Sequence, residues 1–310
     1  GSRLPPARAP GPGSRRGDPG GGRDPPCARG FLFAAMALAG LPALGEVEPL
    51  VQAVNELLGT HELDEAMEKA QEAVVVGQQA KDKVTEAVAL LLVAQVQLAS
   101  EDLDEAMQTA KSAKMKFMTR GIEAGEGIAQ GLIADVQFKA LHNIYDPGAH
   151  KSAVRNTAGA YKQAIDLMHQ AGVKTNALAN AQTSLAALSL STKDAKTAIP
   201  AAKEALDIYQ ELGDDAGSAE AALVLAEAHV LAGISEDYIR QQLILPPATA
   251  HAAAAGKCAE MARGFFEVLE DWDKYERAQA ILDMEKVQTN AKFREVQFVY
   301  DTWALQSTVK

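Results

Sequence analysis

The sequence predicts an all-α protein, a right-handed superhelical solenoid of about six helix-turn-helix repeats. Two observations lead to this fold class. The hexapeptide Glu62–Met67 (ELDEAM) returns forty residues later as DLDEAM at Asp102–Met107, and a fixed period of this size is typical of stacked helical units. Hydrophobic residues make up 47% of the chain but aromatic residues only 5%. Because much of the apolar share is alanine, closely packed helices are favoured over a sheet.

Apolar residues recur at helical spacing from about Val47 onward and outline the first two pairs. In the return helices, Ala66 and Ala106 should face inward, and Asp102 with Glu105 has the spacing of a capping box. Gly121 is well placed to end a helix in a left-handed conformation, as is Gly213 later in the chain. The expected helices are residues 47–58, 63–76, 84–99 and 103–118.

The later pairs follow the same pattern with two departures. From Ala106 to Ala160 is 54 residues rather than forty, so we expect an insertion near residues 142–156 on a loop, where solenoids often carry function. In the fifth pair Gly233 is expected to separate two helices, and Ala198, Tyr238 and Ala278 follow one another at forty-residue intervals. The expected helices are residues 122–141, 152–170, 175–191, 195–211, 218–231, 235–245, 252–270 and 275–288.

The two ends of the chain differ from this repeat domain, which spans residues 46–288. Residues 1–45 comprise a Gly/Pro/Arg-rich segment at residues 1–30, which we expect to be disordered, and a short hydrophobic stretch at residues 31–44. That stretch is either part of a targeting segment or a hydrophobic cap on the solenoid, and residues before Met36 are alternatively upstream sequence. Residues 289–310 form a tail rich in aromatic residues, expected as a capping helix or an extended strand.

Charge and motif content argue against several classes of function. The net charge of −11 opposes nucleic-acid phosphate, and Cys27 and Cys258 offer neither a disulfide framework nor a metal-binding pair. Residues 125–131 contain three glycines but no preceding strand, so no nucleotide site is expected. We therefore expect no catalytic, cofactor or metal residue and no transmembrane span. Reduced thiols favour a cytoplasmic protein, with organellar or secretory-pathway entry open if residues 1–45 are a targeting segment.

The repeated phrases resemble tetratricopeptide repeats, in the longer variety of about forty residues. The resemblance rests on Leu63–Ala66, Leu103–Ala106, Ala201–Leu206 and the turn Leu212–Asp215 leading into Ala221–Leu223. It departs from the family pattern because alanine occupies the places of the usual large aromatic residues. The resemblance implies a non-enzymatic scaffold or adaptor that binds a partner protein or peptide in a concave groove. The alternative is a stably bound structural or assembly subunit of a larger, possibly organellar, complex.

If the first helices line the groove as in that family, ten side chains should point into it. One is an arginine and five are acidic, so a basic or neutral-apolar partner is predicted. Four basic residues lie on one return helix, where they form either a solvated face or a contact for an acidic partner or a membrane surface: Lys111, Lys114, Lys116 and Arg120. The candidate groove residues are Asn55, Gln95, Asp135, Asn180, Thr183, Glu220, Glu227, Glu260, Arg263 and Glu267.

Overall fold

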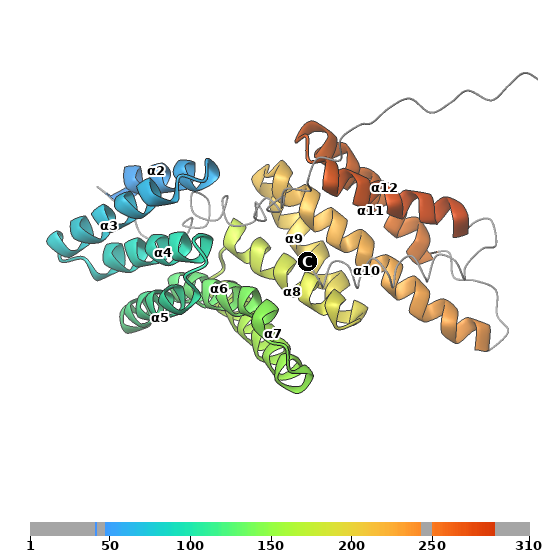
Figure 1. Ribbon diagram of the computed structural model, residues 1–310, viewed down its shortest axis with the longest axis horizontal. Coiled ribbons are helices and arrows are strands. Elements are labelled where there is room, and N and C mark those ends of the chain that lie inside the picture. Colours follow the sequence, from blue (N-terminus) through green and yellow to red (C-terminus); the bar gives the residue numbers. More distant parts are fainter. Residues whose placement is uncertain (1–40, 42–46, 243–249, 289–310) are drawn as a thin grey trace, which may run out of the picture.

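The structure is a computed structural model that describes residues 41, 47–242 and 250–288. Within these residues it contains eleven α-helices, one short 3-10 helix and no strand, which confirms the all-α prediction. Figure 1 shows the helices following one another along the long axis, from α2 near one end to α12 near the other. The expectations for the N-terminal segment and for the aromatic tail fall outside the described residues.

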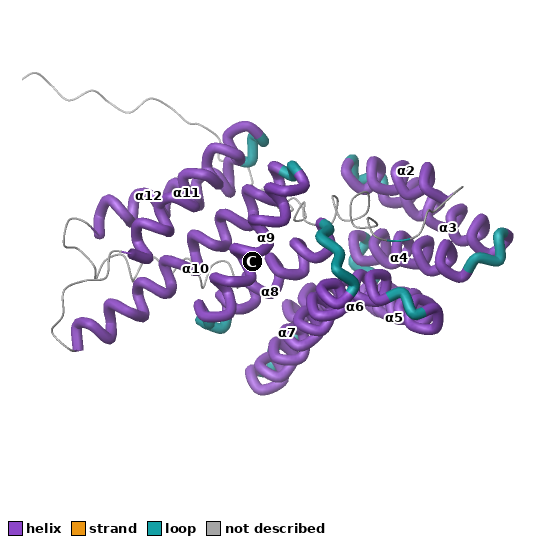
Figure 2. The backbone as a smooth tube through the Cα atoms, turned by 180° about the vertical axis from the view of Figure 1, so that it is seen from behind, coloured by secondary structure: helices purple, strands orange, loops and turns teal. Residues whose placement is uncertain are grey.

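The helices form antiparallel pairs. A short turn joins the two helices of the first, second and fourth pairs, and the view from behind shows how little chain lies at these turns (Figure 2). In order, the pairs are α2 (Glu48–Gly59) with α3 (Leu63–Gln79), α4 (Lys83–Ala99) with α5 (Leu103–Arg120), α6 (Glu123–Ala140) with α7 (Pro147–Gln170), α8 (Asn176–Ser191) with α9 (Ala195–Leu212), and α10 (Asp215–Gln242) with α11 (Ala250–Val268); α12 (Trp272–Gln288) follows, and the 3-10 helix η3 (Leu141–Asn143) precedes α7.

The pairs stack in two layers that are not equivalent. Each helix packs on its neighbours in sequence, and in addition each first helix contacts the next first helix, from α2 and α4 through to α10 and α12. No two consecutive return helices pack to a comparable extent in the described part of the chain. Because the inner layer of a curved stack has the shorter path, its helices approach one another more closely. We therefore assign the first helices to the concave side.

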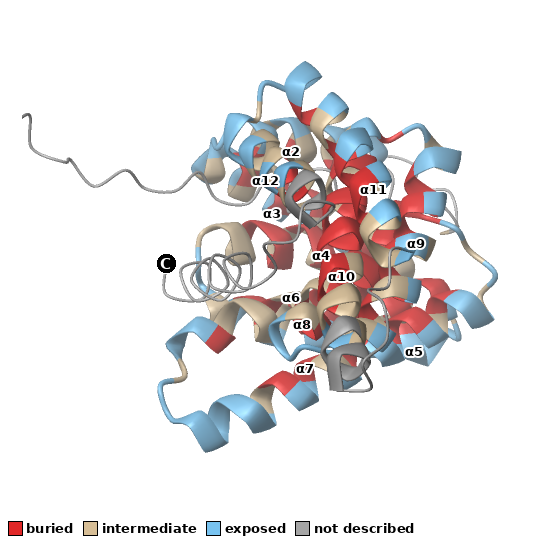
Figure 3. Ribbon diagram, turned by 90° about the vertical axis from the view of Figure 1, so that its right-hand side faces the viewer, coloured by how far each residue is buried: buried red, intermediate tan, exposed pale blue. Residues whose placement is uncertain are grey.

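Return helices bury a stripe of mostly small residues at the spacing i, i+4, i+7 and i+11, which keeps one helical face against the first helices. Alanine at these places lets the helix backbones approach closely. The last position of the stripe is a large residue in every pair but the first, and the third stripe also has Thr157 and Tyr161 where the other stripes have alanine. The stripes are 66/70/73/77, 106/110/113/117, 157/161/164/168, 198/202/205/209 and 255/259/262/266. Figure 3 shows the resulting band of buried residues running through the stack.

A single left-handed residue closes almost every described turn. In the first half these residues follow one another at twenty-residue intervals: His61, Lys81, Glu101 and Gly121. The rest are Gly172, Lys193, Gly213 and Glu270. At all of these turns except the one at Lys81, the next residue donates its backbone N–H to the carbonyl five residues back, which completes a Schellman motif. The predicted left-handed ends at Gly121 and Gly213 are confirmed.

At three crossings between successive pairs, the last residue of a return-helix stripe meets the residue eight or nine positions later in the next first helix. A Cβ added to Gly125 would lie 2.3 Å from the ring of Phe117, and one added to Gly217 would lie 2.3 Å from the ring of Tyr209. At the crossing of the first two pairs, the small residue is on the return helix: a Cβ added to Gly77 of α3 would approach the backbone of Glu86 of α4 to 2.9 Å. The crossings thus combine a large residue with a small one, or bring two backbones into contact.

The structure corrects the predicted second half. No break occurs at Gly233, because α10 is one helix of 28 residues. Consequently α11 is the return helix of the fifth pair, and α12 is the first helix of a sixth. Ala278 therefore lies on a first helix, whereas Ala198 lies on the return helix α9, and the two are not equivalent. Residues 243–249, with their two prolines, lie outside the described residues.

Two local predictions have different outcomes. The insertion near residues 142–156 lies at the α6–α7 connection, where it forms η3 and the exposed start of a 24-residue α7. The prediction of a capping box at Asp102 is wrong. The side chain of Asp102 makes no cap hydrogen bond, and the backbone N–H of Asp102 donates to the carbonyl of Gln97. Aspartates cap other helices instead, including Asp82 before α4 and Asp194 before α9.

One described segment, Asp215–Glu236 in α10, is long and apolar enough to cross a membrane, with a mean hydropathy of 1.3. No transmembrane span was predicted from the sequence. In the structure 67% of this window is buried inside the protein, where α10 packs against α8, α9, α11 and α12. The apolar character of α10 is thus accounted for by its place at the centre of the second half.

Candidate protein-interaction face

The candidate interaction face is the layer of first helices, and seven of the ten predicted groove residues lie on it. Asn55, Gln95 and Asp135 follow one another at forty-residue intervals on α2, α4 and α6. Asn180 and Thr183 lie on α8, and Glu220 and Glu227 lie on α10. Their environments differ, and the differences decide which of them are available to a partner.

The first helices of the first three pairs, α2, α4 and α6, carry buried amide atoms that have no hydrogen-bond partner among the described residues. In Asn55 both the side-chain nitrogen and the side-chain oxygen are in this state, and so is Oε1 of Gln95. Gln97 and Gln137, on α4 and α6, each bury an unpartnered Oε1 as well. A buried polar atom without a partner costs free energy. Four such side chains on α2, α4 and α6 therefore form a group of polar atoms whose hydrogen-bonding capacity is unused within the described residues.

Gln97 and Gln137 were not among the predicted residues, although the sequence contains a signal for them. They are forty residues apart, in the same register as the repeated hexapeptide, and each lies two positions beyond a predicted groove residue. On α4 the partly buried Leu90 and Val93 lie seven and four positions before Gln97, which places all three on one helical face. This face combines apolar and amide groups.

Three of the predicted residues make hydrogen bonds inside the solenoid. Asp135 accepts a hydrogen bond of 2.7 Å from the hydroxyl of Tyr161, which joins α6 to its return helix. Asn180 accepts a hydrogen bond from the hydroxyl of Tyr209 in the same way, joining α8 to α9. Thr183 is buried, and its hydroxyl donates to the carbonyl of Ala179 on its own helix. Asp135 and Asn180 therefore hold helix pairs together, whereas Thr183 bonds only within α8.

The two acids on α10 form ion pairs with α12. Lys274 lies 3.0 Å from Glu220 and 2.9 Å from Asp271, and its ammonium lies 5.6 Å from the centre of the Phe266 ring. Burial alone would lower the pKa of Lys274, but the charges and hydrogen bonds of Glu220 and Asp271 outweigh it, and the pKa is raised. Arg277 lies 2.6 Å from Glu227. The predicted acidic lining is thus paired with cations of the same chain.

The remaining three predicted residues lie on α11, the return helix of the fifth pair, and not on a first helix. Glu260 and Glu267 are exposed there. Arg263 donates from Nη1 to Oε1 of Gln279 on α12 at 2.9 Å. Their placement follows from the continuous α10, which shifts the assignment of first and return helices by one from this point onward.

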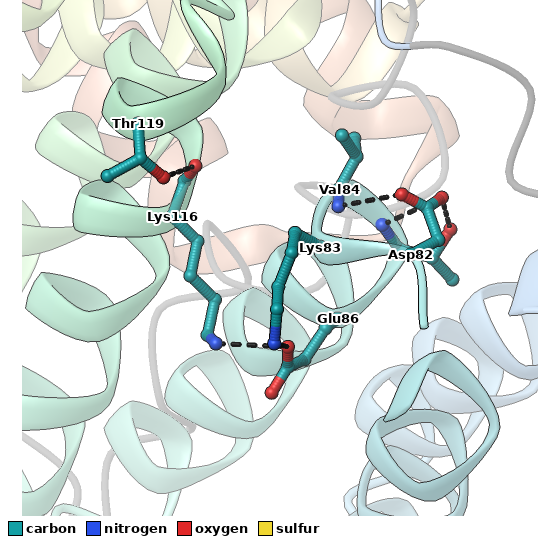
Figure 4. Close-up of polar contacts among 7 residues, drawn as sticks. Asp82, Lys83, Val84, Glu86, Lys116 and Thr119 are labelled. Atoms are coloured by element: carbon teal, nitrogen blue, oxygen red, sulfur yellow. Dashed lines mark hydrogen bonds and ion pairs between the residues drawn. The ribbon is translucent and has the colours of Figure 1, made fainter. Parts of the chain in front are cut away.

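The four basic residues of α5 divide into two kinds. Lys116 lies 3.0 Å from Glu86 on α4, where Lys83 reaches the same carboxylate (Figure 4). Lys114 donates to Oε1 of Gln130 on α6 at 2.8 Å. Lys111 and Arg120 are exposed. The central lysines therefore join α5 to the first helices on either side, which neither of the sequence-based alternatives anticipated.

Chemistry-bearing groups are sparse in the described part of the chain. No group of three or more His, Cys, Asp or Glu side chains there is arranged to hold a metal ion. Burial raises the pKa of the Cys258 thiol, which disfavours the reactive thiolate. The glycines at 125, 127 and 131 lie within α6 and not in a loop, and Gly125 and Gly127 make room for Phe117 and Met168.

Antiparallel helix pairs, a small-residue stripe on each return helix and left-handed turns between them define a helical-repeat protein that resembles the tetratricopeptide class. Solved structures of a Podosopora anserina kinesin light chain with nearly identical TPR-like repeats are similar to this chain. One of them, a point variant, has 10% identity and a TM-score of 0.46 and covers 74% of this chain and 99% of its own. BtubC (BKLC) from P. vanneervenii has 15% identity and a TM-score of 0.43, covering 74% and 92%. No protein-family model matches the sequence, and no curated protein matches it.

Proposed function

We propose that the protein is a non-enzymatic protein-interaction scaffold, and that it binds an extended segment of a partner protein along the first helices α2, α4 and α6. The observation that carries the proposal is the row of unpartnered buried amide atoms on Asn55, Gln95, Gln97 and Gln137. An extended polypeptide exposes N–H and C=O groups along its backbone, and it has no partner for them until it docks. Side-chain amides both donate and accept, so they complement such a backbone.

The same face favours a neutral-apolar partner segment. Leu90 and Val93 lie beside Gln97 on α4 and would contact apolar side chains of the segment. A basic segment is the other candidate, supported by the net charge of −11 and by the exposed Glu260 and Glu267. The ion pairs at Glu220 and Glu227 take away the strongest support for it. We therefore place the neutral-apolar segment first.

The test combines peptide binding with two substitutions that keep side-chain length. Peptides that are neutral-apolar, Lys/Arg-rich or Asp/Glu-rich are compared for binding to the whole chain. In Gln97→Met and Gln137→Met the amide is lost but the shape is nearly kept, and each lost hydrogen bond should weaken peptide binding by about 0.5–1.5 kcal/mol. Stability should hold or rise, because an unsatisfied buried group is removed.

Gln71→Met is the matched control, since Gln71 is exposed on the return helix α3. It should leave both binding and stability unchanged. Preferential binding of acidic peptides would contradict the proposal. So would equal peptide affinity in the wild type and in the folded double variant at Gln97 and Gln137.

A second function, that of a permanently bound subunit of a larger complex, is favoured by one feature. At the α11–α12 turn, Val268 is 82% exposed and Trp272 is 57% exposed, with Leu269 beside them at 45%. Large apolar side chains gathered at one turn are typical of a surface that is covered in the working protein. Size-exclusion chromatography distinguishes the two functions: a soluble monomer favours the scaffold with a transient partner, and aggregation of the isolated chain favours the subunit.

A further inference from the structure

Two histidines that are 22 residues apart face each other between α10 and α11. Nδ1 of His229 lies 3.0 Å from Nδ1 of His251, and the two ring centroids are 5.3 Å apart. Both side chains are partly buried. On the far side of the His251 ring, Nε2 lies 3.7 Å from a carboxylate oxygen of Glu236. Neither histidine has a role that the sequence predicts, because the contact exists only after α10 and α11 have folded against each other.

The number of protons on the pair decides whether it attracts or repels. With no added proton, one ring donates its Nδ1–H to the Nδ1 lone pair of the other. One added proton preserves this N–H···N bond, and Glu236 stabilises a positive charge on His251. A second proton places an N–H on both facing nitrogens, so the hydrogen bond is lost and two like charges stand in contact. The doubly protonated pair therefore disfavours the α10–α11 contact.

We propose that this histidine pair is a pH-sensitive latch on the C-terminal end of the solenoid, and that acidification releases α11 and α12 from α10. The pair lies where α10 meets α11, and α12 packs mainly on α11. Apart from its packing on α11, α12 packs to a smaller extent on α10 and forms the ion pairs Lys274–Glu220 and Arg277–Glu227 with it. Release of the latch would thus loosen the last two described helices while α2–α9 keep their contacts.

The surrounding charges are consistent with this direction of response. On α10, Glu236 faces the pair, and Glu227 two positions before His229 is occupied by Arg277 of α12. From α11 only His251 acts on His229, and no described titratable group of α8 or α9 does so. Burial, and secondly the charge of His251, lower the pKa of His229. The unfolded chain then takes up protons at higher pH than the folded one, so stability falls as pH drops below the ordinary histidine pKa of about 6.5.

The test is hydrogen exchange of the whole chain measured by mass spectrometry at several pH values between 7 and 5. Exchange in α2–α5 of the same molecule serves as the internal reference for the intrinsic pH dependence of the chemistry. We expect amides of α11 and α12 to lose protection relative to that reference, by up to about tenfold per pH unit for one coupled proton.

The informative variant is His229→Asn, because the asparagine amide can still donate to Nδ1 of His251 but does not titrate. Its α11 and α12 amides should show no pH-dependent loss of protection. His251→Asn provides a second route if the first variant does not fold. The matched control is His169→Asn, an exposed histidine on α7 that lies 3.1 Å from Glu204 and should leave the response intact. The inference is overturned by equal protection of α11 in the wild type at pH 7 and 5, or by an unchanged response in both Asn variants.

Discussion

The side chain of Asn176 donates a hydrogen bond of 2.9 Å from Nδ2 to Oδ2 of Asp214, and both residues are buried. Asn176 is the first residue of α8, and Asp214 immediately precedes α10. The other oxygen of Asp214 accepts the backbone N–H of Gly217 at 2.9 Å, which caps α10. One carboxylate thus fixes the starts of two consecutive first helices relative to each other.

Asp214→Ala should therefore be more costly than the loss of an ordinary cap. The cap itself contributes about 0.5–2 kcal/mol, and the buried amide of Asn176 would lose its acceptor at a further cost of about 1–3 kcal/mol. Thermal or urea unfolding measures the sum. Asp102→Ala is the matched control, because Asp102 precedes α5 but makes no side-chain cap hydrogen bond. Equal costs for the two changes would show that the Asn176–Asp214 bond does not contribute.

Position 217 is expected to tolerate only glycine, because the Tyr209 ring fills the space next to it. A Cβ there would lie 2.3 Å from the ring, so Gly217→Ala should force a backbone shift and destabilise the protein by about 1–3 kcal/mol. Gly264, in the exposed face of α11, has no heavy atom within 4 Å of an added Cβ. Gly264→Ala should stabilise the protein by about 0.4–1 kcal/mol. A chemical unfolding curve for each variant tests the opposite signs.

Replacing Lys81, which has a left-handed backbone conformation, by glycine should stabilise the protein. Lys81 has φ 53° and is exposed, and a side chain in this conformation is strained where glycine is not. We expect Lys81→Gly to raise the free energy of unfolding by about 0.5–1 kcal/mol. The control Gln79→Gly, two residues earlier within α3, should instead lower it by about 1 kcal/mol. Destabilisation in both variants would mean that Lys81 contributes a contact that outweighs its strain.

Acid should weaken the α4–α5 contact through Glu86. The hydrogen bond from Lys116, followed by that from Lys83, holds the pKa of Glu86 below its ordinary value. A carboxyl whose folded pKa is lowered contributes stability above its unfolded pKa of about 4.3, and this is lost as pH falls through the folded value. Glu86→Gln should therefore lower stability at pH 7 and reduce its further loss between about pH 5 and pH 2. Exposed Glu65 on α3 supplies the control Glu65→Gln, whose pH profile should follow the wild type.

Much of the fold could be predicted because the repeat is nearly identical in its first copies. The hexapeptide at Glu62 and Asp102 sets a period that the structure keeps from α2 to α6, and glycine marked the turns at 121 and 213. The turns at His61, Lys81 and Glu101 carry no such mark, since a left-handed non-glycine residue looks like any exposed polar residue in sequence. Gly233 misled in the opposite direction, because a glycine inside a helix with many packing partners is tolerated there.

The candidate interaction face was harder to predict than the fold. Counting backwards along the sequence from the inward alanines placed Asn55, Gln95 and Asp135 on the first-helix layer. The count could not show that Asp135 accepts a hydrogen bond from Tyr161, or that Glu227 forms an ion pair with Arg277. Such partners come from the next helix at distances that a period does not specify. The His229–His251 contact is of the same kind.

The alternation of large and small residues at the crossings has a consequence for the order of the units. Since Lys81 and Gly121 both have a left-handed backbone conformation and are forty residues apart, residues 82–121 could be excised or duplicated without a change in the forty-residue register. Excision would bring Gly77 against Gly125 and leave a void where the Phe117 ring now lies, whereas duplication would press that ring onto Thr85. The side chains at these crossings therefore encode which unit follows which, so the repeats are alike in spacing but are not interchangeable parts.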